Sequence, residues 1–447
     1  MNKFSHPYSV LMLVAVSIAI YSNALAGIER ASLAGNVTQA NAGSYQAAIS
    51  DDGRYIAFRS NASNLVGSDT NNMSDIFVRD TETGVTERVS VTTEGGQFMN
   101  GSFAPSISDD GRFVAFQSNQ SSNGDNCWGG ACWTKIFVYD RQTHRSIFIL
   151  PPAGNNPQDR TARLEPCISG NGRFVAFHSQ SNPYSSQPPS VNPPQDDHNA
   201  AFDIYVYDLQ GKTTERVSRD SSGNEGNGDS FSASLSDDGN LVAFYSYSNN
   251  LVLNDTNDCE DVFVKNRSTG AVTRASVSSD GKEGNDDSYE PCISGNGRYV
   301  AFRSRASNLV PGDTNKAWDI FVHDLQTGKT ECVSRASDGT AANADSYRPS
   351  ISDDGRFVTF RSNASNLVAG DTNNRWDIFV HDRLTGITTR VNLNSSGGQA
   401  NIHSYAPAIS GDAHFVAFES DATNLVTGDT NAARDIFVTE TVPGIGN

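Results

Sequence analysis

The chain has 447 residues, of which 37% are hydrophobic and 19% are charged, and its formal net charge at pH 7 is −18. This acidic balance argues against nucleic acid and against anionic membrane surfaces as partners, whereas it permits cations such as calcium. Length alone would suggest two or three domains. The repeats described below remove that inference, because repeats extend a fold without enlarging a single core.

The first 26 residues have the features of an export signal. Lys3 supplies a positive charge, residues 10–20 form an apolar core, and Ala24-Leu25-Ala26 fits a small-x-small cleavage site. The apolar core is too short to span a bilayer. We therefore expect residues 1–26 to be removed as a signal peptide, with no membrane span in the mature chain and a secreted or periplasmic location.

Seven copies of one sequence unit follow the signal. An Ile or Leu before a Ser marks the end of a short strand in each copy, and the steps between successive markers are 58, 61, 67, 58, 58 and 58 residues. Register that is kept over seven copies indicates a repeat architecture. The markers are Ile49, Ile107, Ile168, Leu235, Ile293, Ile351 and Ile409.

The sixth copy, residues 346–393, shows the unit most plainly. Four strands are predicted in it, at 347–352, 356–362, 378–382 and 388–393. Gly-containing turns join the first strand to the second and the third to the fourth, and a long polar loop joins the second to the third. The second strand is apolar on both faces, as expected of a strand between neighbouring sheets. Seven such four-stranded antiparallel sheets predict a seven-bladed β-propeller.

The two ends of the chain indicate how the ring closes. The seventh copy reaches its third strand, predicted at 435–439, and then lacks a fourth. Residues 28–33 resemble the fourth strand at 273–277 and are expected to complete the last blade, which closes the ring and removes its exposed edges. We therefore expect residues 27–447 to form a single all-β domain. Its blades are predicted at 44–91, 102–150, 163–219, 230–277, 288–335, 346–393 and 404–440 plus 28–33.

The repeat ISDDGRFVAF, followed by a loop and by DIFVxD-x-x-TG-x-T-x-R, resembles the TolB-like, WD-repeat-like β-propeller repeat of bacterial secreted proteins. The resemblance covers residues 28–440 and implies the propeller fold. It implies little about function, because propellers host many unrelated functions. TolB itself has six blades and a separate N-terminal α/β domain, and neither is predicted here, so the resemblance does not imply a role in the Tol system.

A polar motif, Asp-Thr-Asn-x-x-x-Asp, recurs in the loop between strands two and three. Alternating Asp and Asn oxygens followed by another Asp can wrap Ca²⁺, which would give one calcium site per regular blade. The alternative is that these side chains hydrogen-bond to the loop itself. We favour this alternative, because a full calcium loop has a Gly at its sixth position and a terminal Glu. The residues are Asp69, Asn71, Asp75, Asp255, Asn257, Asp261, Asp313, Asn315, Asp319, Asp371, Asn373, Asp377, Asp429, Asn431 and Asp435.

A second motif, Asn-x-x-Ser-aromatic, recurs in the connections between blades and lies on the same face as the Asp-Thr-Asn loops. We expect it to pack and hydrogen-bond the loops rather than to bind a ligand. Its members are Asn285, Ser288, Tyr289, Asn343, Ser346, Tyr347, Asn401, Ser404 and Tyr405.

The second and third copies carry insertions in the same loop, with Trp128 and Trp133 in one and Tyr184 in the other. One position near the end of strand two is an arginine in three copies. The other copies have different residues there, among them His178 and Tyr245. A His/Tyr pair can serve as acid and base, and aromatic rings stack on sugar faces, so these five residues are candidates for a carbohydrate groove. The alternative is drift at a tolerant position. His323 and His381 are expected to be exposed strand residues. The residues at the varying position are Arg59, Gln117, His178, Tyr245, Arg303, Arg361 and Glu419.

Six cysteines in an exported chain suggest disulfides. Cys259, in a loop of blade four, is predicted to pair with Cys292, taken as the start of the first strand of blade five. Cys132–Cys167 is a second predicted pair, with Cys127–Cys132 as its competitor. Cys332, on an outer strand, is predicted to be a free thiol.

The leading hypothesis for function is a non-catalytic, monomeric binding propeller. Its ligand would be a protein or a glycan, held on the face that carries the Asp-Thr-Asn loops. One alternative is a carbohydrate-active enzyme, similar to a polysaccharide lyase, on the same face. Another is a structural protein of the cell envelope that binds calcium as its cofactor. The sequence contains no nucleophile elbow, phosphate loop, zinc signature or dinucleotide fingerprint.

Overall fold

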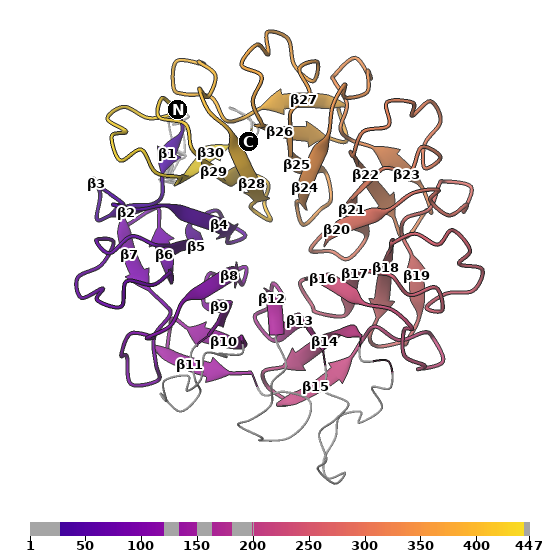
Figure 1. Ribbon diagram of the computed structural model, residues 1–447, viewed down its shortest axis with the longest axis horizontal. Coiled ribbons are helices and arrows are strands. Elements are labelled where there is room, and N and C mark those ends of the chain that lie inside the picture. The colour runs from indigo at the N-terminus through magenta and orange to yellow at the C-terminus, as the bar shows by residue number, and fades with distance from the viewer. Residues whose placement is uncertain (1–26, 120–133, 150–162, 181–198, 200, 442–447) are drawn as a thin grey trace, which may run out of the picture.

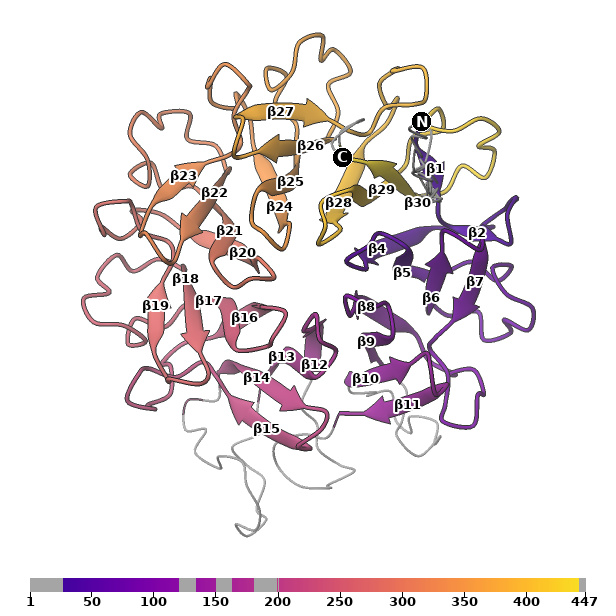
Figure 2. The same ribbon diagram turned by 180° about the vertical axis from the view of Figure 1, so that it is seen from behind.

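A computed structural model describes residues 27–119, 134–149, 163–180, 199 and 201–441. Seven four-stranded antiparallel sheets stand around a central channel and form a seven-bladed β-propeller (Figures 1 and 2). In each blade the first strand faces the channel and the fourth lies at the outer edge (Figure 1). The described part of the chain contains no helix that is long and apolar enough to cross a membrane.

The first three complete blades have these strands. Blade one contains β4 (Ser44–Ile49), β5 (Tyr55–Ser60), β6 (Asp75–Asp80) and β7 (Val85–Arg88). Blade two contains β8 (Ser102–Ile107), β9 (Phe113–Ser118), β10 (Lys135–Asp140) and β11 (Arg145–Phe148). Blade three contains β12 (Arg163–Ile168), β13 (Phe174–Gln180), β14 (Phe202–Asp208) and β15 (Thr213–Arg216).

The next three blades repeat this order. Blade four contains β16 (Ser230–Leu235), β17 (Leu241–Ser246), β18 (Asp261–Asn266) and β19 (Val272–Arg274). Blade five contains β20 (Ser288–Ile293), β21 (Tyr299–Ser304), β22 (Asp319–Asp324) and β23 (Thr330–Cys332). Blade six contains β24 (Ser346–Ile351), β25 (Phe357–Ser362), β26 (Asp377–Asp382) and β27 (Ile387–Arg390), within a few residues of the strands predicted for this copy.

The last blade joins the two ends of the described chain, as the sequence predicts. It contains β28 (Ser404–Ile409), β29 (Phe415–Ser420) and β30 (Asp435–Glu440), with β1 (Glu29–Arg30) as its outer strand. Glu29 lies opposite Val438 and Arg30 opposite Phe437. The short strands β2 (Leu33–Ala34) and β3 (Thr38–Gln39) form a hairpin that leads into blade one.

Phenylalanines at equivalent positions fill the space between blades. Phe58 lies opposite Phe77 across β5 and β6, both are fully buried, and their ring centroids are 5.9 Å apart. The same stacked pair, at the same distance, recurs in blades five, six and seven. Each hydrophobic cluster joins neighbouring blades; for example, Val322 of blade five packs with Phe360 of blade six. Because burying one such side chain contributes about 1.5–3 kcal/mol, packing between blades is the main stabilising term of the ring.

The two faces of the ring carry different connections. The short turns lie on one face, called the turn face here, and the long loops and blade connections lie on the other, called the loop face. At the centre of the turn face, a backbone N–H of each blade donates to a carbonyl oxygen of the next, at 3.0–3.1 Å. The ring closes where Asp412 N–H donates to the carbonyl oxygen of Asp51. The donors in order are Asp51, Asp109, Asn171, Asp237, Asn296, Asp353 and Asp412.

The predicted disulfide between Cys259 and Cys292 is wrong, because both residues are free thiols. The strand β20 begins at Ser288, so Cys292 lies near its turn-face end, whereas Cys259 lies in a loop of the loop face, with its Sγ 3.3 Å from the carbonyl oxygen of Asn257. Cys167 occupies the equivalent place in β12, and its predicted partner, Cys132, lies outside the described residues, so this pair stays a prediction.

Cys332 is a free thiol, as predicted. Cys127 and Cys132 lie outside the described residues, and so does the predicted signal peptide. The prediction that His323 and His381 are exposed is wrong, because they are only 4% and 7% exposed. The outer strand of each blade covers them, and the Nδ1 atom of each lies 2.8 Å from a threonine hydroxyl of that strand.

Candidate functional site

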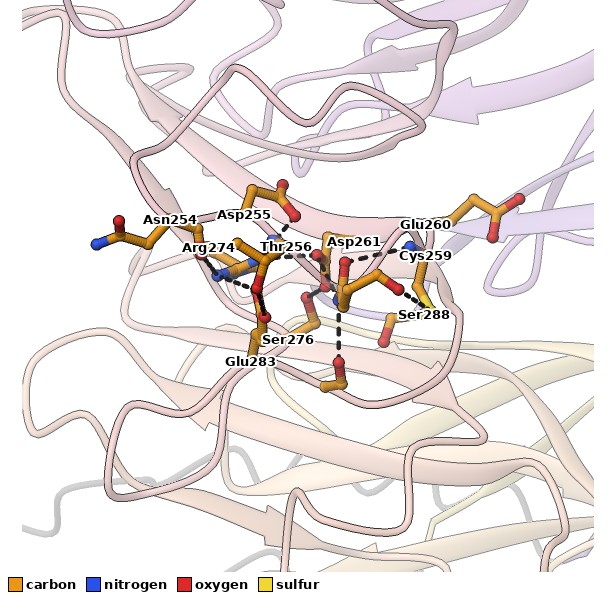
Figure 3. A network of polar contacts seen from close by, with 12 residues as sticks. Asn254, Asp255, Thr256, Cys259, Glu260, Asp261, Arg274, Ser276, Glu283 and Ser288 are labelled. Atoms are coloured by element: carbon orange, nitrogen blue, oxygen red, sulfur yellow. Dashed lines mark hydrogen bonds and ion pairs between the residues drawn. The ribbon is translucent and has the colours of Figure 1, made fainter.

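The Asp-Thr-Asn motif builds a buried polar network. In blade four (Figure 3), the Asn257 amide donates to Asp261 at 3.0 Å, while its oxygen accepts the Cys259 N–H at 3.1 Å. Arg274, from the fourth strand, lies between two carboxylates, 3.1 Å from Asp255 and 2.9 Å from Asp261. These contacts attach the long loop to strands three and four of its own blade.

The same arrangement recurs and does not fit a calcium site. Arg88, Arg390 and Arg30 each lie within 4 Å of the two motif aspartates of blades one, six and seven. A Ca²⁺ ion between the carboxylates would need the place that the guanidinium holds, and the Asn oxygen is already engaged by a backbone N–H. Blade five differs, because Cys332 stands where Arg274 and Arg390 stand in their blades.

The Asn-x-x-Ser connections also have a structural role. The Asn343 amide donates to Ser365 at 3.0 Å, and the hydroxyl of Ser346 donates to that of Ser362 at 3.0 Å. The equivalent contacts of Asn285 and Ser288 are 3.1 and 2.9 Å. These bonds fix each blade connection to the long loop beside it. The tyrosine that ends the motif has a different environment, described below.

The candidate pair His178 and Tyr245 is not arranged for acid–base chemistry. Both side chains pack on Phe231, with ring centroids 5.2 Å and 5.6 Å from it. His178 is 4% exposed, and burial lowers its pKa although Glu165 acts in the opposite sense. Burial also raises the pKa of Tyr245 to about 12. A buried neutral imidazole and a phenol that stays protonated at neutral pH are poorly suited to exchange protons with a substrate. The candidates Trp128, Trp133 and Tyr184 lie outside the described residues.

A belt of aromatic rings and arginines lines one side of the channel at the loop face, from blade five through blade seven to blade two. It begins with cross-strand pairs, because the second residue of each first strand lies opposite the fifth residue of the second strand. The residue just before strand three adds a tryptophan in blades five and six and an arginine in blade seven. We call this set the aromatic–arginine belt: Tyr289, Arg303, Trp318, Tyr347, Arg361, Trp376, Tyr405, Arg434, Tyr45, Arg59 and Phe103.

Blades five and six form the densest part of the belt. The ring centroids of Trp318 and Tyr347 are 6.5 Å apart, and those of Tyr347 and Trp376 are 5.4 Å apart. The Arg303 guanidinium lies 4.8 Å from the Trp318 ring and 4.9 Å from that of Tyr347. The Arg361 guanidinium lies 5.3 Å from Tyr347 and 5.1 Å from Trp376. The Arg303 guanidinium therefore lies between rings of two blades, and so does that of Arg361, which is also 5.8 Å from Tyr405 of blade seven; all five side chains of blades five and six remain partly exposed.

The belt continues through blade seven to blade one. The Arg434 guanidinium lies 3.9 Å from the Tyr405 ring and 5.5 Å from the Tyr45 ring. It also pairs with Asp421 at 2.9 Å, so its charge is balanced. The Arg59 guanidinium lies 4.8 Å from Tyr45 and 5.0 Å from Phe103. The stacking thus passes from one blade to the next around this side of the channel.

A hollow of about 510 Å³ adjoins the Phe103 end of the belt. It opens on the loop face between blades one and two, and most of its lining groups are amides and hydroxyls. Its lining residues are Asn61, Asn72, Met73, Ser74, Asn100, Gly101, Phe103 and Asn119. A hollow with both polar and apolar lining beside aromatic rings suits a ligand that has hydroxyl groups and apolar faces.

Four carboxylates crowd the opposite, turn-face end of the channel: Asp51, Asp109, Asp237 and Asp353. In the other blades a glycine holds the equivalent place, and a Cβ added to any of these glycines would collide with the carboxylates. Burial and, to a smaller extent, repulsion from Asp237 raise the pKa of Asp109 to about 7 and that of Asp353 to about 8. Among the described residues, no group of three or more acidic, histidine or cysteine side chains is arranged to hold a metal ion. The three glycines are Gly170, Gly295 and Gly411.

Comparisons with known proteins agree with the fold. No family model matches the chain, and no curated protein sequence matches it. Oligogalacturonate lyase from Vibrio parahaemolyticus is 12% identical, with 93% of this chain and 94% of that one covered at a TM-score of 0.55. An oligogalacturonate lyase in complex with manganese is also 12% identical, with 93% of both chains covered at a TM-score of 0.54.

A further match is TolB from Acinetobacter baumannii, 17% identical over 71% of this chain, with a TM-score of 0.40. The chain spans 59% of the length of that TolB. The chain has a seven-bladed β-propeller fold. At these identities the likenesses show the fold alone, since propellers carry many unrelated functions.

Proposed function

We propose that this chain is an exported, non-catalytic binding propeller that holds a glycan at the aromatic–arginine belt of its loop face. The observation that carries the proposal is the convergence of Trp318, Tyr347 and Trp376 with two guanidiniums at partly exposed positions around the channel. Aromatic rings offer flat apolar faces to sugar rings, and guanidinium groups offer several N–H donors to hydroxyl and carboxylate oxygens.

A glycan suits this surface better than a protein partner does. The core of a protein interface is more apolar than the rest of the surface. Among the described residues, the large exposed hydrophobic side chains are scattered, and one of them, Met73, 45% exposed, lines the hollow beside Phe103. A polar surface with spaced aromatic rings is the pattern expected for a ligand that is rich in hydroxyls.

The environment of the His/Tyr pair supports binding rather than catalysis. The buried His178 and the raised pKa of Tyr245 leave this pair without a group that titrates near neutral pH in contact with solvent. Export is proposed from the sequence of residues 1–26. Calcium is not required by this proposal, because arginines hold the places between the motif aspartates.

The proposal is tested by applying purified residues 27–447 to a glycan array, with a parallel lyase assay that follows the ultraviolet absorbance of unsaturated products. We expect binding without product. The double variant W318A/W376A should weaken binding at least about tenfold, since a stacked aromatic pair contributes about 0.5–1.5 kcal/mol and each ring also buries area. Leu384→Ala, an exposed change on the turn face, is the matched control. Full binding by W318A/W376A, or no retained glycan at all, would refute the proposal.

A further inference from the structure

Three arginines of the belt share a position and an environment. Arg59, Arg303 and Arg361 occupy the same position of strand two in blades one, five and six. In each of them the Nε atom is buried without a hydrogen-bond partner. The fourth-strand arginines Arg88, Arg274 and Arg390 share this feature but pair with the motif aspartates, so what distinguishes the belt arginines is their partly exposed position at the channel mouth.

The charges around these arginines are not balanced. Arg303 and Arg348 each lie 3.4 Å from a carboxylate oxygen of Glu290, which therefore serves two cations. Among the described residues, Arg361 has no ion pair and no hydrogen-bonded side chain. Burial lowers the pKa of Arg361, and the positive charge of Arg348 lowers it further. In a chain whose net charge is −18, Arg361 is thus a cation at the channel mouth that has no carboxylate of its own among the described residues.

Aromatic contacts fix the orientation of these guanidiniums. Arg361 lies among three rings, 5.3 Å from Tyr347, 5.1 Å from Trp376 and 5.8 Å from Tyr405. Rings on its faces balance part of its charge, but they leave its in-plane N–H donors free to meet an acceptor. A planar guanidinium with free donors matches a carboxylate, which accepts two parallel hydrogen bonds from such a group.

Resting on the glycan-binding function proposed above, we infer that blades five and six bind a carboxylated, acidic polysaccharide. Arg361 and Arg303 would receive carboxylate groups of the sugar units, while Trp318, Tyr347 and Trp376 contact the faces of the rings. The arrangement explains together why Arg361 has no carboxylate of its own and why the aromatic rings around it stay partly exposed. It assigns the same set of residues both the affinity for sugar and the selection of acidic sugars.

The test compares two forms of one polymer. Residues 27–447 are titrated with polygalacturonate and with its fully methyl-esterified form, and dextran sulfate serves as a polyanion without carboxylates. We expect binding of polygalacturonate to be at least about tenfold tighter than binding of either other polymer, and to weaken as salt is added. Arg361→Gln should reduce that binding at least about tenfold, whereas Arg361→Lys, which keeps the charge but not the planar donors, should reduce it less.

Lys329→Gln is the matched control, because it removes one exposed positive charge from the turn-face side of the same sector and should leave binding unchanged. Arg303→Gln provides a second variant if Arg361→Gln does not fold. Equal binding of the two polygalacturonate forms, with loss in W318A/W376A, would overturn the acidic-sugar inference and leave the glycan-binding function in place. Equal or tighter binding of dextran sulfate would overturn the carboxylate assignment. Binding of an acidic peptide but of no polysaccharide would overturn both proposals.

Discussion

The hydroxyl of Ser32 donates a 2.6 Å hydrogen bond to Asp435, a residue 403 positions later in the chain. Ser32 also accepts the backbone N–H of Ile436 at 3.2 Å. In blade four the same contact joins Ser276 to Asp261, which belong to one continuous segment. The last blade is therefore built like the others, but from the two ends of the described chain, and its contacts close the ring.

Arg30 gives a direct test of this closure. It is 8% exposed and pairs with Asp429 at 2.9 Å and Asp435 at 3.3 Å. Arg30→Ala leaves two buried carboxylates without their cation, so we expect a loss of about 3–5 kcal/mol in the free energy of unfolding. The measurement is urea unfolding followed by tryptophan fluorescence.

Arg274→Ala is the matched control for Arg30→Ala, because it removes the equivalent ion pairs from a continuous blade. We expect both variants to lose stability, and we expect Arg30→Ala alone to unfold markedly faster, since β1 is attached to its blade only through noncovalent contacts. Equal unfolding rates of the two variants would contradict a special role of the closing strand.

Cys332→Arg is expected to stabilise the protein. In blade five, Cys332 takes the place of the arginine that lies between the motif aspartates in blades one, four, six and seven. Burial raises the pKa of Asp319 to about 6, although the charge of Arg335 acts in the opposite sense. An Asp whose folded pKa is raised binds its proton more tightly when folded, so its contribution to stability is lost as the pH rises through about 6. An arginine at position 332 would pair with the ionised carboxylate and should add about 1–3 kcal/mol at pH 8.

The pH dependence distinguishes this effect from general packing. The gain in Cys332→Arg should be largest at pH 8 and should shrink toward pH 4, where Asp319 is protonated in the folded wild-type protein. Cys332→Met, which adds volume without charge, is the control and should show no such dependence. A gain that is equal at both pH values would show that the ion pair is not its cause.

The fold could be predicted from the sequence because it repeats. Strand length, turns and apolar patterning agree in seven copies, and the missing strand at one end matches a spare strand at the other. The disulfide prediction was wrong because the start of one strand was placed at the wrong residue. With Cys292 taken as the first residue of its strand, it would lie at the loop face beside Cys259, but the strand begins at Ser288.

The aromatic–arginine belt was harder to predict, because no single copy contains it. Arg361 contacts Trp376 of its own blade and Tyr405 of the next, and only the closed ring brings these residues together. The sequence did contain a signal, since arginine at this position alternates with other residues among the copies. The prediction followed the copies that depart from arginine, His178 and Tyr245, whereas the structure gathers partly exposed rings around the copies that keep it.

Calcium is expected to leave stability unchanged. The guanidinium of Arg390 lies 3.0 Å from Asp371 and 3.4 Å from Asp377, so the carboxylates already have a cation. The midpoint of thermal melting should therefore be the same, within about 1 °C, in excess Ca²⁺ and in excess EGTA, because a ligand that binds only the folded state would raise it. A midpoint that rises with Ca²⁺ concentration would restore the calcium interpretation of the loops.

The four crowded carboxylates at the turn-face end of the channel should lower the free energy of unfolding at alkaline pH. Burial and then repulsion from Asp237 raise the pKa of Asp353 to about 8, above its unfolded value. Such a carboxyl is protonated in the folded state at pH 5 to 7, and its favourable contribution is lost as the pH rises through about 8. Asp353→Asn keeps the shape and removes the charge. It should therefore raise the free energy of unfolding at pH 9 by about 1–2 kcal/mol after screening by solvent, with a smaller effect at pH 5.

Asp258→Asn, on an exposed loop, is the control and should change stability at neither pH. If Asp353→Asn instead destabilises the protein at pH 9, the carboxylate accepts hydrogen bonds that outweigh the repulsion in the ring, and charge crowding is not what limits the stability of the channel.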